Sequence, residues 1–503
     1  MTVEVKVEET QMAEVVVALK EPKKIVEGKV VEEDVKAMEL VDDSKPKTVQ
    51  KSSSYKEESN FFSDLKELEK KALSDLKSKL EEAILGNTLF EKDESKKKEK
   101  PLAENVEKEK EEKEAAETDK TDQKEETQHK EDEKEIAGEE EEKKPDVGVE
   151  AKSNEIDKEI SLWGIPLLPS RGTEGTDVIL LKFLRAREFK VNDAFEMLRK
   201  TLKWRKEVNI DSVLDEDLGA DLTSAANMNG IDREGHPVCY NIFGVFDSEA
   251  LYQKAFGTEV KRIQFLRWRC QLMEKGIQKL DLKPGGVSSL LQINDLKNSP
   301  GPSKKELRIA TKQAVDMLQD NYPELVAKNI FINVPFWYYA LNALLSPFLT
   351  QRTKSKFVVA RPAKVTETLL KYIPVEEIPV NYGGFKREND IEFSGQDVDA
   401  TDLILKAGST ETIEISALEV GNTLVWNLTV LGWEVYYKEE FVPSDEGSYT
   451  IIVQKGKKIG SQEGPVRNSF RNNEPGKIIL TIENTSSKKK RVLYRYKTNK
   501  GSF

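Results

Sequence analysis

The stretch that decides the fold reads QDNYPE at residues 319–324 and NIFINVPFWYYALNALLSPFL at residues 329–349. This pattern predicts a turn, a short buried strand, a proline corner and a helix that is almost entirely apolar. No charged side chain occurs from Asn329 to Gln351, although 34% of the residues in the chain are charged. Such a run requires an apolar neighbour, which can be a protein core, a membrane or a bound lipid.

Strand-like and helix-like segments alternate on both sides of this stretch. That alternation predicts an α/β domain with a largely parallel sheet, preceded by a helical region with helices at residues 178–190 and 192–206. The expected strands cover residues 238–243, 288–293, 330–334 and 356–360, and the expected helices cover residues 259–278, 303–320, 336–349 and 365–372.

The pattern of polar and apolar residues changes after about residue 400. Short segments of alternating polar and apolar residues are separated by glycine and polar turns, at the spacing of an all-β sandwich of about 100 residues. These segments cover residues 411–416, 423–430, 433–437, 449–453, 477–482 and 491–496.

Most of the negative charge lies in the N-terminal third of the chain. Residues 1–150 carry a net charge of −16 and residues 151–503 carry +4, which together give the −12 of the whole chain. Residues 91–150 hold 39 charged residues and no aromatic one, so this segment is expected to be disordered. Residues 151–503 lack the large positive net charge that is typical of nucleic-acid binding. Their modest positive charge favours transient contact with an anionic membrane.

One helix is expected inside the acidic tail, at residues 60–85. Its leucine, alanine and isoleucine residues recur every three or four positions, which indicates an amphipathic helix. The polar positions mix both signs of charge, so a contact with a partner or with the folded part is favoured over a membrane. The apolar positions are Leu65, Leu68, Ala72, Leu76, Leu80 and Ile84.

Several classes of protein are disfavoured by what the sequence contains. Two cysteines, Cys239 and Cys270, make no disulfide framework, and together with two histidines they leave little material for a zinc site. The N-terminus has no apolar core of a secretory signal, and no run reaches the length of a membrane span. No nucleophile elbow, phosphate loop or dinucleotide fingerprint is present, so we expect no enzyme, no catalytic residue, no metal and no cofactor.

Four motifs together resemble the CRAL-TRIO family of lipid-binding proteins. They are LLKFLRAREF at residues 180–189, DREGHPV at 232–238, the 319–349 stretch and IPVNYGG at 378–384. Within this resemblance, the C-terminal β-domain looks like a GOLD domain, and the order of the parts is that of the patellins of plants. The implied domains are an acidic tail at 1–150, a CRAL-TRIO N-terminal helical region at 155–230, the lipid-binding domain at 231–390 and the GOLD sandwich at 395–503.

The resemblance also implies where a phospholipid is held. The apolar helix at 336–349 is the expected lid of the lipid pocket, although an ordinary buried core helix is the alternative. The residues expected to form this lipid gate helix are Phe336, Trp337, Tyr338, Leu341, Leu344, Leu345 and Phe348. The family's inositol headgroup contacts correspond here to Arg187, Glu324, Thr353 and Lys356.

Two departures from the family pattern affect the expected ligand. Glu188 stands where the family often has a lysine, which can alter headgroup choice. Leu290 and Gln292 stand where some members have small hydroxyl residues for phosphatidylcholine, so exchange of that lipid is not expected. A further basic cluster, Lys488, Lys489, Lys490 and Arg491, is expected in an exposed turn before the last strand, as a second membrane contact or as a solubilising turn.

These observations predict a peripheral membrane protein that binds or transfers phosphoinositides. The resemblance implies a role in membrane trafficking and plant cell division, in the cytoplasm and on the plasma membrane or cell plate. A protein–protein adaptor that uses the GOLD domain and the N-terminal helix is the first alternative. A carrier of another hydrophobic molecule, such as a tocopherol or retinoid, is the second, and no nucleic-acid partner is expected.

Overall fold

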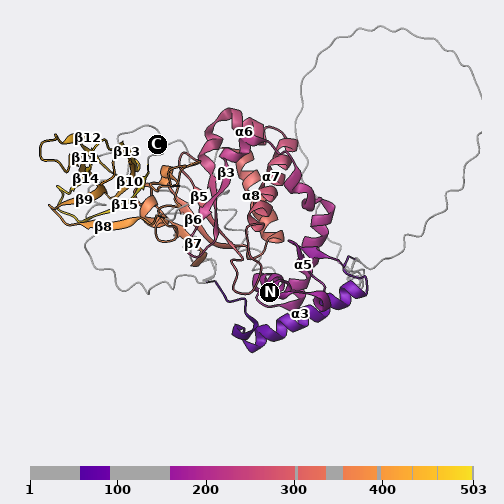
Figure 1. The fold of residues 1–503 in the computed structure, drawn as a ribbon. Coiled ribbons are helices and arrows are strands. Elements are labelled where there is room, and N and C mark those ends of the chain that lie inside the picture. The colour runs from indigo at the N-terminus through magenta and orange to yellow at the C-terminus, as the bar shows by residue number, and fades with distance from the viewer. Residues whose placement is uncertain are drawn as a thin grey trace, which may run out of the picture.

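The computed structural model describes residues 57–90, 159–300, 304–335, 355–393, 398–432, 434–460 and 463–500. These residues form a helical and α/β part followed by a β-sandwich, which lie next to each other (Figure 1). The fold class expected from the sequence is confirmed. The expected disorder at 91–150 and the expected lid at 336–349 lie outside the described residues.

The α/β part is built on a five-stranded sheet in the order β3-β4-β5-β6-β7. Strand β3 is antiparallel to β4, and the other four strands run parallel. Side chains alternate between the two faces of a strand, so Leu290 packs against residues of α7, whereas Leu291 packs against residues of α11 on the opposite face. The strands are β3 (Ala226–Ile231), β4 (Pro237–Ile242), β5 (Leu290–Asp295), β6 (Val326–Ile332) and β7 (Phe357–Val359).

Seven α-helices accompany this sheet in the described part of the chain. Long helices follow β4 and β5 where the alternating pattern predicts them, because a crossover between parallel strands needs one. The helices are α3 (Glu67–Leu85), α4 (Glu174–Ala186), α5 (Val191–Glu207), α6 (Glu249–Phe256), α7 (Glu259–Ile277), α8 (Lys305–Asn321) and α11 (Val365–Leu369). A small hairpin, β1 (Ser161–Leu162) and β2 (Ile165–Pro166), precedes α4.

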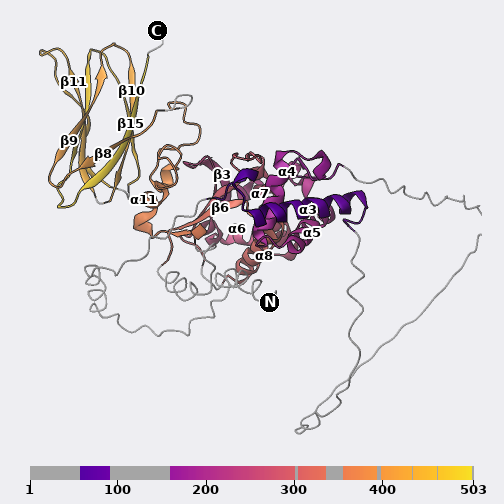
Figure 2. The same cartoon turned by 90° about the horizontal axis from the view of Figure 1, so that it is seen from below.

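Helix α3 docks on α4 and α5, as Figure 2 shows, although residues 91–158 separate them in the sequence. Its Leu73, Leu76 and Leu80 are 1% exposed or less and share one core with Phe183 and Leu198. The intramolecular contact favoured by the sequence is therefore present. Leu68 was expected on the apolar stripe but is 82% exposed. It lies eight residues before Leu76, which places it about 80° away from Leu76 around the helix axis.

The C-terminal part is a sandwich of two four-stranded antiparallel sheets, in the orders β13-β10-β15-β8 and β12-β11-β14-β9. The sequence predicts six of these strands and misses β8 and β13, whose burial does not alternate cleanly. Trp426 is fully buried between the sheets. The strands are β8 (Thr401–Leu405), β9 (Thr410–Ala417), β10 (Thr423–Leu431), β11 (Val435–Pro443), β12 (Ile451–Ile459), β13 (Val466–Arg471), β14 (Gly476–Glu483) and β15 (Lys490–Asn499).

Both apolar and ionic contacts join the sandwich to the α/β part. Leu431 and Leu493 belong to the same buried cluster as Leu370. Arg467 makes a bidentate ion pair with Asp390, with two N–O distances of 2.7 Å. Planar two-point pairs of this kind fix orientation as well as distance, so the sandwich is held in a defined position against the sheet.

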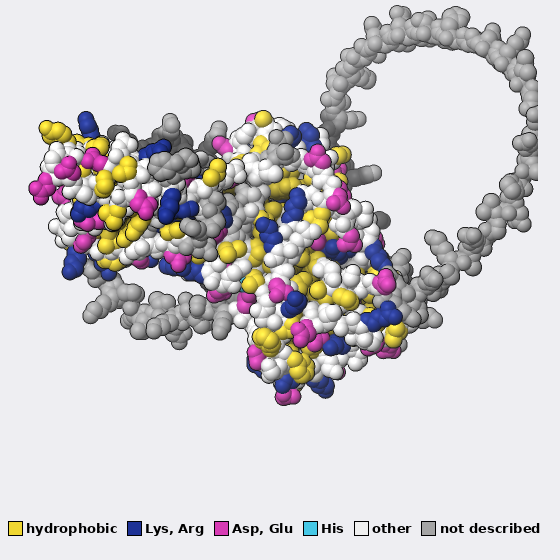
Figure 3. Space-filling model, viewed as in Figure 1, with side chains coloured by type: hydrophobic (Ala, Val, Ile, Leu, Met, Phe, Trp, Pro, Cys, Tyr) yellow, Lys and Arg dark blue, Asp and Glu magenta, His cyan; other side chains and the backbone are white. Residues whose placement is uncertain are grey.

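The described surface carries both signs of charge. On the face seen in Figure 3, acidic and basic side chains are interspersed over both folded parts, and hydrophobic side chains show between them along the α/β part. None of the described helices combines the length and the hydrophobicity that a bilayer span requires.

Candidate functional site

Four parallel strands bring four polar side chains to one edge of the sheet. His236 directly precedes β4, Ser289 directly precedes β5, and Lys356 directly precedes β7, while Glu324 lies two residues before β6. The amino ends of neighbouring parallel strands lie at the same edge. The edge therefore carries a cluster of polar groups drawn from four separate regions of the sequence.

Glu324 and Lys356 form the centre of this cluster. The Nζ of Lys356 lies 2.7 Å from the Oε2 of Glu324, and the two side chains are 15% and 17% exposed. Glu324 has a φ of 51°, in the left-handed region that non-glycine residues rarely adopt. Such backbone conformations persist where the surroundings hold them, and they concentrate at functional sites.

The turn before Glu324 is held by a buried aromatic and ionic network. The ring of Tyr322 stacks on Trp163 and meets Trp204 edge-on, with centroids 6.2 and 6.0 Å apart. Its hydroxyl donates to Glu274 at 2.8 Å, and Glu274 also accepts a 2.5 Å hydrogen bond from Arg205. These contacts fix the position from which Glu324 reaches Lys356.

Helix α4 contributes a buried lysine to the cluster. Lys182 is 3% exposed, and its Nζ donates to the backbone carbonyl of Glu324 at 2.8 Å and to the Oγ of Ser288 at 3.3 Å. Burial lowers the pKa of Lys182 to about 8, against the opposing pull of the Glu57 and Glu324 carboxylates. An ammonium that is buried yet largely charged at neutral pH suits the binding of an anion.

Arg185 lies on the same face of α4 as Lys182, three residues further along. Its Nε lies 2.8 Å from the Oε2 of Glu58. Its terminal nitrogens donate to the side chain of Asn60 at 2.6 Å and to the backbone carbonyl of Ser59 at 2.7 Å. We call residues 57–60 the strap, because this short segment lies across the polar cluster.

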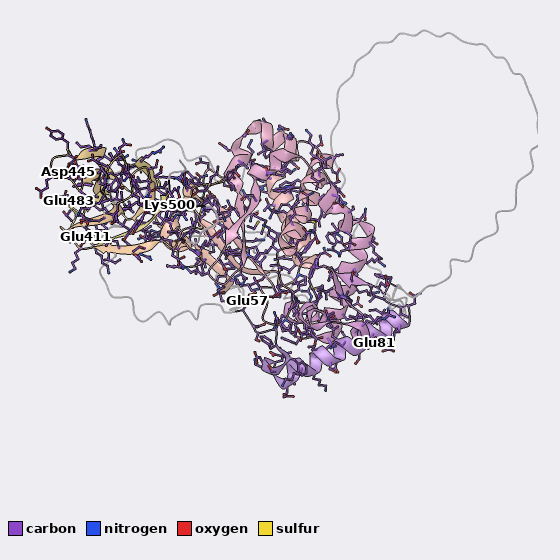
Figure 4. The ribbon with its side chains drawn as sticks, in the orientation of Figure 1. Glu57, Glu81, Glu411, Asp445, Glu483 and Lys500 are labelled. Carbon is purple, nitrogen blue, oxygen red and sulfur yellow. The ribbon has the colours of Figure 1, made fainter. Side chains whose placement is uncertain are left out.

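The other end of the strap reaches the strand edge. The carboxylate of Glu57 accepts hydrogen bonds from the hydroxyl of Ser289 and from the Nε2 of His236, the latter at 2.9 Å. Burial alone would raise the pKa of Glu57, but the hydrogen bonds from His236 and Ser289 outweigh it and lower the pKa to about 2. Figure 4 places Glu57 between α3 and the α/β part, far from Glu81 on α3.

His236 is 3% exposed and has a carboxylate at each ring nitrogen. Its Nδ1 lies 2.8 Å from Asp232 and its Nε2 faces Glu57. Burial would lower the pKa of His236, but the hydrogen bonds to Asp232 and Glu57 outweigh it and raise the pKa to about 9. An imidazolium that donates from both nitrogens has no lone pair with which to activate a nucleophile, so this histidine acts as a cation.

The structure brings together two of the four headgroup residues expected from the sequence. Glu324 and Lys356 are paired, whereas Thr353 lies outside the described residues, as do all the expected lid residues. Arg187 caps the end of α4, and its guanidinium donates to the carbonyl of Ala186 at 2.9 Å. Arg187 lies just beyond the last turn of α4, and its role at a headgroup stays a prediction. Arg185 is the arginine of this motif that contacts the strap.

Sequence reasoning missed Lys182, Arg185, Ser289 and His236. One signal for Lys182 was present, because it is a single cation within a run of apolar residues at 178–184, which predicts a buried and paired side chain. The contribution of Glu57 has no sequence signal, since it is one of many glutamates in an acidic segment. No group of three or more His, Cys, Asp or Glu side chains in the described ranges is placed to hold a metal ion.

The basic cluster at 488–491 differs from the four exposed cations expected. Lys488 and Lys489 are exposed in the turn between β14 and β15, but Lys490 is 4% exposed. Arg491 lies 2.6 Å from the carboxylate of Asp402 on β8. The expectation is corrected because β15 begins at Lys490, and strand alternation directs that side chain inward.

Comparisons with known proteins agree with this architecture. Residues 64–200 match the CRAL/TRIO N-terminal domain, residues 223–384 match the CRAL/TRIO domain, and residues 406–490 match the Patellin-1-like, C-terminal GOLD domain. The first range includes α3 and so begins ahead of the boundary that we set at residue 155. The helical region is therefore matched across the acidic insertion.

Several relatives match over long ranges. The chain is 59% identical to Patellin-4 of Arabidopsis thaliana, over 99% of both chains. It is 52% identical to Patellin-5 of Arabidopsis thaliana, over 67% of this chain and 50% of that one. Phosphatidylinositol transfer protein SFH5 of Scheffersomyces stipitis is 32% identical over 41% of this chain and 66% of its own. The near-complete coverage at 59% identity, together with the GOLD domain match, shows that the chain belongs to the patellin family.

Proposed function

We propose that this chain binds a phosphoinositide in its CRAL-TRIO domain and acts on the surface of membranes in trafficking. The observation that carries the proposal is the pairing of Glu324 with Lys356 beside the buried Lys182. A phosphorylated inositol needs cations and hydroxyl donors for its phosphates and an acceptor for its ring hydroxyls. Lys182, Lys356 and Ser288 offer the first two, and the Glu324 carboxylate offers the third.

The lipid tails set a second requirement. Burial stabilises a methylene group by roughly 0.8 kcal/mol, so an acyl chain of about sixteen carbons needs an apolar enclosure worth on the order of 12 kcal/mol. The apolar run at 336–349 is suited by composition to cover such a chain. A relative named for phosphatidylinositol transfer supports the same class of ligand.

The test is the lipid that the full chain retains. Wild-type protein incubated with mixed vesicles is repurified, and its lipid is extracted and identified by mass spectrometry. We expect the wild type to retain phosphoinositides and the double variant Lys356→Met/Glu324→Gln to lose them. The matched control is Lys386→Met/Glu377→Gln, which removes another part-buried ion pair of the same domain. A retained tocopherol or retinoid, or equal phosphoinositide content in both double variants, would reject the headgroup assignment.

A second candidate function is protein binding by the sandwich. Strand β12 is the edge of its sheet and carries exposed apolar side chains, with Tyr449 91%, Ile451 44% and Ile452 60% exposed in and before it. Exposed apolar edge strands are templates for the addition of a partner strand. Affinity purification of the wild-type chain and of Ile452→Lys tests this adaptor function. The function requires that specific proteins co-purify with the wild type and not with the variant.

A further inference from the structure

The strap places carboxylates on donors that lie beside the groups assigned to a phosphate in the proposed function, Lys182, Lys356 and Ser288. Glu57 accepts from Ser289 and His236, and Glu58 pairs with Arg185. Asn60 bridges Arg185 and Ser288 through its side-chain amide, at 2.6 and 3.3 Å. One four-residue segment thus contacts most of the donors at this edge of the sheet.

We propose that the strap is an internal competitor for this anion site: the carboxylates of Glu57 and Glu58 occupy the place that a phosphomonoester takes when a ligand binds. The proposal rests on the proposed function, since it concerns the same headgroup site. It adds that the site recognises a phosphomonoester group and that the chain regulates access to it with its own acidic residues.

The charges of the cluster support this exchange. Apart from Glu234, which is 64% exposed and lies 3.9 Å from His236, the cluster sets four cations, Lys182, Arg185, His236 and Lys356, against four carboxylates, Glu57, Glu58, Asp232 and Glu324. With the strap in place, the formal charges balance. Departure of the strap removes two carboxylates and leaves an excess of two positive charges, which a phosphomonoester of charge −1.5 to −2 neutralises. Its three terminal oxygens can accept from the donors that Glu57 and Glu58 release.

The strap can leave without unfolding the helix that follows it. Residues 57–60 have no helix or strand of their own, whereas α3 is fixed by a separate leucine core. The Glu57 and Glu58 side chains remain 32% and 45% exposed, so water can reach the contacts that break. Phe61 and Phe62, at the junction, are 48% and 56% exposed. The segment therefore has the low local burial that is typical of elements which open separately.

The experiment compares the full-length wild type with Glu57→Gln/Glu58→Gln. Glutamine keeps the size of each side chain but removes its charge, so the strap loses its ionic hold. The control is Glu81→Gln, a neutralised glutamate on α3 that Figure 4 shows far from Glu57. Two probes are titrated: soluble inositol 1,4-bisphosphate, and vesicles of phosphatidylcholine with 5% phosphatidylinositol 4-phosphate, where the ~5% content keeps surface charge low.

We expect the strap variant to bind tighter than wild type by on the order of tenfold, because the competent state no longer has to displace the strap. The Glu81→Gln control should match wild type. A gain with both probes assigns the site to the phosphomonoester itself, and a gain with vesicles alone assigns it to a membrane lipid. Wild-type binding that is unchanged or weakened by Glu57→Gln/Glu58→Gln overturns the inference while leaving the proposed function intact.

Hydrogen exchange gives a second readout on the unaltered chain. Saturating inositol 1,4-bisphosphate should increase backbone exchange in residues 57–66 while α3 stays protected, because the ligand displaces the strap. Unchanged or slower exchange there, with ligand bound, contradicts displacement. Absence of binding by wild type and variant to either probe rejects the proposed function, and the inference falls with it.

Discussion

The Nζ of Lys182 donates a 2.8 Å hydrogen bond to the backbone carbonyl of Glu324, so a buried cation on α4 ties the helical region to the turn before β6. The same turn directs the Glu324 carboxylate to Lys356. Three parts of the chain that are far apart in sequence therefore meet at one edge of the sheet. The proposed headgroup site depends on this junction more than on any single motif.

Removal of the buried lysine tests that junction. Lys182→Met is expected to weaken binding to vesicles containing phosphatidylinositol 4-phosphate by tenfold or more, on the order of the 1.5–3 kcal/mol of a hydrogen bond to a charged group. Lys190→Met, which changes an exposed lysine of the same region, serves as the control. Vesicle flotation measures the affinity, and a thermal melt verifies the fold. Wild-type affinity in a folded Lys182→Met protein would contradict its assignment to the site.

The network beneath Tyr322 should matter for stability. Arg205→Met leaves the Glu274 carboxylate buried with no guanidinium, which typically costs about 3–5 kcal/mol of unfolding free energy. Urea denaturation measures the loss. The double variant Arg205→Met/Glu274→Met should recover most of it, because no buried charge is then left unpaired and Asp211, the other partner of Arg205, is 74% exposed. Equal losses in the single and double variants would show that packing, not charge pairing, is responsible.

His236, which contacts the strap through Glu57, predicts a pH dependence of stability. The pKa of His236 is raised from 6.5 to about 9, so its contribution is complete below pH 6.5 and is lost as the pH rises through 9. Asp232, Glu57 and Glu234 are the carboxylates that face its ring, the last at 3.9 Å.

The pKa of Lys182 is lowered to about 8, so its effect on stability is opposite to that of His236. Stability rises as the pH increases from about 8 to the pKa of this lysine in the unfolded chain. The measurement is therefore the unfolding free energy of wild type and His236→Asn between pH 6.5 and 8. The wild type should lose stability relative to the variant over this range. Parallel pH profiles would show that His236 does not gain a proton on folding.

Only part of the basic cluster should act at a membrane. Lys488→Gln/Lys489→Gln should weaken attachment to anionic vesicles, because each exposed lysine near such a surface contributes about 1 kcal/mol. Lys490→Gln changes a buried side chain and should alter thermal stability instead. Co-sedimentation at two salt concentrations measures attachment, with lipid content determined separately. If the two exposed lysines can be neutralised without effect, this turn only keeps the domain soluble.

The apolar run at 336–349 supplies a prediction that rests on sequence. Leu344→Asp/Leu345→Asp should abolish lipid retention, because an unpaired carboxylate is costly beside acyl chains. Mass spectrometry of co-purified lipid measures the effect, and circular dichroism of the sandwich strands is the control. Wild-type lipid content in this variant would exclude the run as the cover of the pocket.

The alternation of strands and helices at 238–372 was sufficient to predict the parallel sheet, since periodicity and turn residues are local properties of a sequence. The same holds for the sandwich, apart from β8 and β13. Glu324 and Lys356 were each identified through family resemblance, and the structure pairs them with one another. Arg187 was assigned through the same resemblance, and its headgroup role stays a prediction, whereas Arg185, which pairs with Glu58, was not identified from the sequence.

The sequence by itself determined most of the helices and strands, although it missed β3, α6, β8 and β13. It also determined where the acidic charge lies and that the 329–351 run needs an apolar neighbour. These follow from short-range periodicity and from the cost of exposing or burying particular side chains. Only the tertiary structure decided that α3 docks across a long acidic insertion and that Glu57 reaches His236 and Ser289. Contacts between residues so distant in sequence depend on chain closure and three-dimensional packing, which leave no local periodic signal for a glutamate in an acidic segment.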